Sequence, residues 1–117
     1  MEHRALPLEL VAGSYAVCRL AASDPLPAWA GEGPFVSVTR TDAELSVVCP
    51  QEAVPAAVVA EPGWRCLRVV GPLGFGMTGV LASLSGPLAS SGVSIFVVST
   101  YDTDYLMVQE RDLDRAV

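Results

Sequence analysis

The sequence has no lysine, no asparagine and a single histidine among its 117 residues. Its seven basic residues are therefore all arginine, and thirteen acidic residues bring the formal charge to -6. A negative field of this kind repels the phosphate backbone of nucleic acids. We expect no nucleic acid among the partners. The abundance of Ala, Arg, Gly and Pro without Lys or Asn is typical of a GC-rich bacterial gene.

Long apolar runs are also missing. The longest, at residues 54–60, is interrupted by Pro55 and is far shorter than the roughly 20 residues that span a bilayer. Residues 1–4 lack the charged and then apolar order of a secretion signal. Each cysteine lies in an apolar segment and is expected to be a core residue of a reduced protein. They are Cys18, Cys49 and Cys66. We therefore expect a cytoplasmic protein with no membrane partner.

A recognisable catalytic or metal-binding motif is absent as well. The one histidine, His3, lies close to the N-terminus, where chains are usually poorly ordered, and no nucleophile and base can be paired. Asp102 and Asp104 lie two positions apart, which is far short of a calcium-binding loop. We expect no catalytic residue, no metal and no cofactor.

The residues that are present predict a folded domain, because 51% are hydrophobic and 17% charged. The most regular helix pattern runs from Met77 to Ser91, with its apolar residues on one face. Shorter helices are expected at residues 51–60 and 111–117, and at most a turn or two around residues 28–30. Turn residues separate the strand-like segments. These are residues 15–20, 35–40, 45–49, 64–70, 93–100 and 105–110.

The two halves of the chain repeat the element order βαββα, which opens a ferredoxin-like βαββαβ unit. The expected fold is α+β, with two such units in tandem at residues 1–62 and 63–117. Each half lacks its own final strand, and we expect the other half to supply it. Residues 95–98 and 106–108 are apolar on both strand faces, whereas the helices of one small unit cover only one face of a sheet. A homodimer is the expected assembly.

Two loops have the composition of a binding site. Residues 71–79 join a strand to the best helix, and their glycines and the helix N-terminus suit a carboxylate. The hairpin connection at residues 99–104 carries hydroxyls, a tyrosine and two carboxylates, of which Asp102 is expected to meet an amino group. Together the loops match a zwitterion. The alternative is that the glycines only make a tight turn and the hairpin residues only bond their own backbone.

The run from Gly71 to Leu81, the Pro-Leu-Ala of residues 87–89 and the segment from Gly92 to Val108 resemble the ACT-domain proteins of the small bacterial tandem type. Related ACT repeats occur in aspartokinases and in the CASTOR arginine sensors. The likeness is specific in the second half, whereas the first half matches in element order alone. It implies a ferredoxin-like fold, with an amino acid bound at the interface between ACT units.

By position, the resemblance implies that the glycine loop contacts the ligand's backbone and that the hairpin lines the facing strand end. The residues so implied are Gly74, Phe75, Gly76, Met77, Thr78, Ser99, Thr100, Tyr101 and Asp102. The predicted function is a non-catalytic regulatory protein that binds a free amino acid. One alternative is a ligand-free ACT-like module that dimerises or docks on a partner enzyme. Another is a small enzyme, for which no acid, base and nucleophile set can be assembled.

Overall fold

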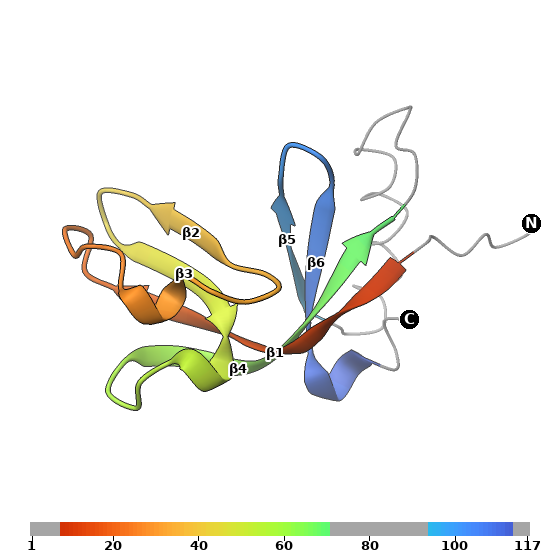
Figure 1. Cartoon of the computed structure of the whole chain (residues 1–117), viewed down its shortest axis with the longest axis horizontal. Helices are drawn as coiled ribbons and strands as arrows, with labels where there is room; N and C mark the ends of the chain where they lie inside the picture. The colour runs from red at the N-terminus through yellow and green to blue at the C-terminus, as the bar shows by residue number, and fades with distance from the viewer. Residues whose placement is uncertain (1–7, 71–93, 114–117) are drawn as a thin grey trace, which may run out of the picture. The chain divides into compact units, whose positions relative to one another are not determined.

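The computed structural model describes residues 8–70 and 94–113 (Figure 1). The chain divides into two compact units, of which one is Val11–Trp64 and the other combines Met1–Leu10 with Arg65–Val117. Among the described residues, no helix is long and apolar enough to cross a membrane.

Two long strands contribute to both units. These are β1 (Leu8–Leu20) and β4 (Val59–Val69), and the boundary between the units falls after Leu10 in β1 and after Trp64 in β4. Within the unit that holds most of the second half, Glu9 of β1 pairs with Arg68 of β4 at 2.8 Å. The first residues of β1 are thus bonded to a strand of the other half of the sequence.

The unit Val11–Trp64 contains strands in the order β2-β3-β1-β4. β2 (Ser37–Arg40) and β3 (Leu45–Pro50) form an antiparallel hairpin, and β1 pairs antiparallel with the other side of β3. Alternate residues of β3 point into one core because side chains alternate between the faces of a strand. This core consists of Ala16, Cys18, Ala30, Leu45, Val47 and Cys49.

The other unit contains strands in the order β1-β4-β6-β5. β5 (Ile95–Ser99) and β6 (Asp104–Gln109) form an antiparallel hairpin in which Ser99 lies opposite Asp104. Its core is built from two residues of β4 and two of β6, namely Leu67, Val69, Leu106 and Val108.

The two hairpins, β2–β3 and β5–β6 (Figure 1), share the hydrogen-bond pattern of their turns. In the first, the backbone N–H of Thr41 donates to the carbonyl oxygen of Glu44 at 2.9 Å, and in the second Thr100 donates to Thr103 at 2.8 Å. Each threonine hydroxyl also accepts a bond from the backbone N–H of the fourth turn residue, at 3.2 Å in both. Short 3₁₀ turns follow both hairpins at the same spacing, as η2 (Gln51–Ala53) and η3 (Glu110–Asp112). The hairpins are therefore a structural repeat.

Most of the expected strands are present, but the segment between β3 and β4 was predicted incorrectly. The helix expected at residues 51–60 is only the three-residue η2, because Pro55 cannot donate and forces Val54 into an extended conformation, with ψ of 123°. Residues 61–63, whose Glu-Pro-Gly sequence is typical of a turn, lie inside β4. There Gly63 has a φ of 89°, and its N–H donates to the Gln51 side chain.

The remaining helix predictions have mixed outcomes. A single 3₁₀ turn, η1 (Ala28–Ala30), occupies the proline-rich crossover as expected. The helix expected from Arg111 begins as η3 at Glu110. The helix expected from Met77 to Ser91 lies outside the described residues.

Burial agrees with the apolar character of the second hairpin. Leu106, Met107 and Val108 are consecutive and all buried, so both faces of β6 are covered. β5 is only half-buried from Ile95 to Val98, and it stands at the end of the strand order. All three cysteines are free and buried, as predicted.

Candidate functional site

The structure places the predicted hairpin residues in and beside one tight turn. Ser99 ends β5, and the next three residues form the turn itself. The side chains of Tyr101 and Asp102 are exposed, and Tyr101 is 103% exposed relative to its reference state. The other predicted ligand residues, Gly74, Phe75, Gly76, Met77 and Thr78, lie outside the described residues.

Thr103 ties this turn to the end of β4. Its hydroxyl donates a 2.8 Å hydrogen bond to the carbonyl oxygen of Val69, and the bond is buried. Because Val69 is the last residue of β4, the hairpin tip is held at the strand end from which the glycine sequence continues at Gly71. The hairpin turn is therefore tied to the strand that precedes the glycine loop in the sequence.

Asp104, the next residue, is the most unusual side chain of the hairpin. It is 0% exposed, and neither carboxylate oxygen has a hydrogen-bond partner in the part of the chain that the structure describes. It shares a strand face with Leu106 and Val108, which belong to the core. A buried polar group without a partner costs about 1–3 kcal/mol, and a charged one costs more.

The repeat shows what the same position holds in the other hairpin. There, the first residue after the turn is Leu45, which is also 0% exposed and belongs to its core. One hairpin thus satisfies this position with an apolar side chain, while the other places an unpaired carboxylate there. A group that costs stability and makes no bond within the protein is suited to bind a cationic group from outside.

The sequence-based interpretation gave this carboxylate no role, because it assigned the ammonium-binding role to Asp102. Amino-acid composition alone does not show that Asp104 is buried while Asp102 is exposed. The distinguishing signal lies in the repeat, since aligning Thr41 with Thr100 sets Asp104 opposite a core leucine.

The cysteine thiols are poor nucleophiles in this structure. Burial raises the pKa of Cys66 to about 12 and that of Cys49 to about 11, with the nearby Cys18 adding to the second shift. Thiols with such pKa values stay protonated at neutral pH, and the thiolate is the reactive form. Within residues 8–70 and 94–113, no group of three or more His, Cys, Asp or Glu is arranged to hold a metal ion.

Fold and site together define an α+β protein with repeated hairpins on a sheet, in which one hairpin carries a buried carboxylate without a partner in the described part of the chain. The family model for the ACT domain matches residues 59–117, and a model for the N-terminal domain of a further family matches residues 13–57. The chain belongs to the ACT-domain family, which confirms the resemblance seen in its sequence.

Solved structures and curated relatives agree with this assignment. The crystal structure of an Agrobacterium tumefaciens protein is 46% identical and has a TM-score of 0.91, covering 97% of this chain and 85% of that one. The cytosolic arginine sensor for mTORC1 subunit 1 of Bos taurus is 34% identical over 90 residues, covering 68% of this chain and 27% of the sensor. The ligand-free regulatory subunit of aspartate kinase from Thermus thermophilus is 14% identical and has a TM-score of 0.62, covering 96% and 94% of the two chains. It shares the fold.

The chain is shorter than its curated relatives. It spans 56% of the length of the human putative protein CASTOR3P, to which it is 34% identical over 92 residues. The chain is thus related to the arginine sensors, and it shares its fold with the regulatory subunit of an aspartate kinase.

Proposed function

We propose that the protein is a non-catalytic regulatory protein that binds a free amino acid at a site between ACT units. The observation that carries this proposal is the unpartnered, fully buried carboxylate of Asp104 at the position that the other hairpin fills with Leu45. A cationic group of the ligand would supply the missing partner, and charge-assisted hydrogen bonds are the strong ones. An arginine-like side chain or the α-ammonium group has this chemistry.

We assign the carboxylate group of the ligand to the glycine loop. Its sequence has glycine at positions 74 and 76, where no side chain shields the backbone N–H groups, and this suits a carboxylate. The Thr103 bond to Val69 supports this pairing, because it fixes the hairpin end to the strand that precedes that loop in the sequence. Ser99, Thr100, Tyr101 and Asp102 would then line the entrance.

For the assembly, we propose two ferredoxin-like units, nominally residues 1–62 and 63–117, that exchange strand segments. The division of β1 and β4 between the compact units supports the exchange. A homodimer is supported by β5, a half-buried apolar strand at the end of the strand order, because proteins seldom leave such an edge unpaired. Sedimentation at micromolar concentration tests the dimer, and a clean monomer would contradict it.

The regulatory and non-catalytic role rests on the relatives. One is named as a cytosolic arginine sensor and another as a regulatory subunit of aspartate kinase. By analogy we assign this protein to the cytoplasm and to the control of a partner enzyme or complex. The mechanism is linkage, since a ligand shared by two units stabilises the arrangement that binds it.

The test is a thermal-shift series with each of the twenty amino acids. A ligand that binds only the folded protein raises Tm in step with its concentration. We expect such a rise with at least one amino acid, and we expect Asp104→Asn to abolish it. Asp102→Asn is the matched control, because it removes the same charge from an exposed position two residues away.

The possible outcomes separate the alternatives. Loss of the shift in Asp104→Asn alone assigns the ammonium or guanidinium contact to the buried carboxylate. Loss in Asp102→Asn alone assigns it to the turn instead. A flat Tm at millimolar concentrations of every amino acid would favour the ligand-free docking module.

A further inference from the structure

Ser99 is the residue that faces Asp104 across the second hairpin. The two lie directly opposite each other in the antiparallel ladder of β5 and β6. Directly opposite side chains share one face of a sheet, with their Cβ atoms about 5 Å apart. Ser99 is exposed, whereas Asp104 is fully buried. Ser99 is therefore the exposed cross-strand neighbour of the buried carboxylate.

The rest of β5 on this face is apolar. Ile95 and Val97, which alternate with the residues of the other face, pack against the core of this unit. Among residues 95–99 on this face, Ser99 alone carries a polar side-chain group. Neither oxygen of Asp104 has a hydrogen-bond partner in the part of the chain that the structure describes. The Ser99 position is therefore where β5 offers polar chemistry beside that carboxylate.

The first hairpin shows a different pair at the equivalent position. There Arg40 lies directly opposite Leu45, as Ser99 lies opposite Asp104. The guanidinium of Arg40 donates to the carbonyl oxygen of Ala22, and Leu45 is buried in its core. One hairpin end thus pairs a long cationic side chain with an apolar residue, and the other pairs a short hydroxyl with a carboxylate.

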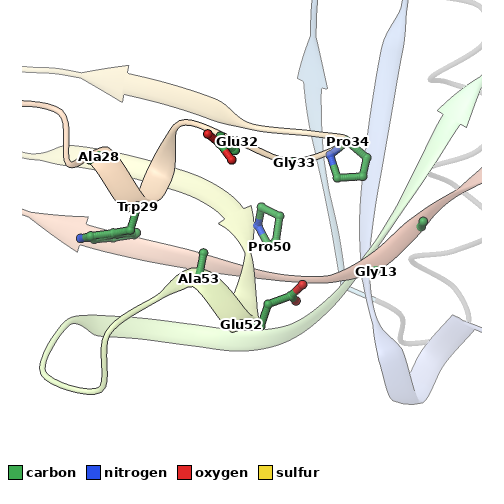
Figure 2. A pocket seen from close by; sticks show the side chains of 10 residues that line it. Gly13, Ala28, Trp29, Glu32, Gly33, Pro34, Pro50, Glu52 and Ala53 are labelled. Carbon is green, nitrogen blue, oxygen red and sulfur yellow. The ribbon is translucent and has the colours of Figure 1, made fainter.

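The end of the first hairpin is also separate from the cavity of its unit. That cavity, of about 650 Å³, is lined by β1, by η1 with the loop after it and by the end of β3 with η2 (Figure 2). Pro50, at the end of β3, contributes to the lining, whereas Leu45, at its start, does not. Arg40 and Leu45 are therefore a comparison pair whose groups are satisfied within the fold.

We propose that Ser99 is the specificity-determining residue of the site at Asp104. Its short side chain leaves room for an ammonium or guanidinium group of the ligand beside the carboxylate, and its hydroxyl oxygen accepts one of the ligand's N–H donors. A longer side chain at this position occupies the same space, and an arginine supplies the cation from within the chain. This inference rests on the proposed function, because it concerns the same carboxylate.

The first test needs no ligand. Ser99→Arg places a guanidinium opposite the carboxylate, and we expect it to raise the Tm of the ligand-free protein by about 3 °C or more relative to Ser99→Gln. Ser99→Gln is the matched control, because its side chain is long and polar but uncharged. In an Asp104→Asn background the advantage of arginine over glutamine should disappear. An arginine variant no more stable than the glutamine variant, or an equal advantage without the carboxylate, would overturn the inference.

The second test repeats the thermal-shift series with the twenty amino acids on two variants. We expect Ser99→Arg to weaken by about tenfold or more the apparent affinity for any amino acid that raises the Tm of the unsubstituted chain. Ser99→Ala, which removes only the hydroxyl, should weaken it by about threefold. Undiminished binding in Ser99→Arg would refute the role of Ser99 and leave the proposed function standing. A flat Tm for the unsubstituted chain would contradict the proposed function, even where the first test succeeds.

Discussion

Asp104 and Leu45 occupy equivalent positions in two hairpins with the same turn, and both side chains are fully buried. The leucine packs in its core, whereas the aspartate has no partner for either oxygen in the described part of the chain. The repeat therefore provides an internal reference for what this position needs for stability alone.

Replacing Asp104 by leucine should stabilise the ligand-free protein. The change removes a buried polar group that makes no bond, and we expect the free energy of unfolding to rise by about 1–3 kcal/mol. Urea denaturation measures this. The reciprocal change, Leu45→Asp, should destabilise by about 3 kcal/mol or more, because it buries an unpaired charge. A less stable Asp104→Leu would show that the carboxylate serves the fold.

Removing the Thr103 hydroxyl should loosen the hairpin tip from β4. Thr103→Val keeps the shape of the side chain but leaves the Val69 carbonyl oxygen without this bond, and we expect a loss of about 1–2 kcal/mol in the free energy of unfolding. Thr103→Ser keeps the hydroxyl and is the control. If amino-acid binding depends on this connection, Thr103→Val also weakens the ligand-induced rise in Tm. Equal stabilities of the valine and serine variants would contradict the role of the bond.

Gly33 and Gly31 are neighbouring glycines of the segment between β1 and β2, and replacing each by alanine compares a position with a positive φ to one without. Gly33→Ala should destabilise by about 1–3 kcal/mol, because an L-residue is strained at a φ of 138° and its Cβ meets Pro50. Gly31 has a φ of -92°, and a Cβ there would lie at an ordinary 3.5 Å from its nearest neighbour. Gly31→Ala should therefore change stability by less than about 1 kcal/mol in either direction. Thermal denaturation distinguishes the two variants, and equal losses would argue against the close approach.

Stability should fall at alkaline pH because of the buried thiols. Burial raises the pKa of Cys66 from 9.0 to about 12, so the unfolded chain loses this proton first. The stabilising contribution is therefore complete below pH 9 and declines as pH rises towards 12. Urea denaturation between pH 8 and 11 measures the slope. Cys66→Ala removes this contribution and should give a shallower decline, whereas an identical slope would contradict the assignment.

The hairpins were predictable from the sequence because their apolar runs are bounded by Thr-Asp turns. The expected strand 45–49 and the observed β3 differ by one residue at one end. β4 was harder to predict, since Glu61, Pro62 and Gly63 have the composition of a turn. Their place in a strand depends on Gly63 donating to Gln51, a contact across twelve positions that local preferences do not show.

The candidate sites were predictable only in part, for a related reason. Sequence composition drew attention to residues 99–104, and the structure places them in one turn tied to β4. The burial of Asp104 depends on packing between segments that are distant in sequence. The same is true of the cavity in the unit Val11–Trp64 that Trp29 helps to line.

Because β1 and β4 each contribute to both compact units, a cut between the two halves of the chain, after residue 62, would fall inside β4. Recombination that moved one half into another gene would leave both products with an incomplete sheet edge. Both halves should therefore be kept together when this sheet is grafted elsewhere, with the cuts placed outside them.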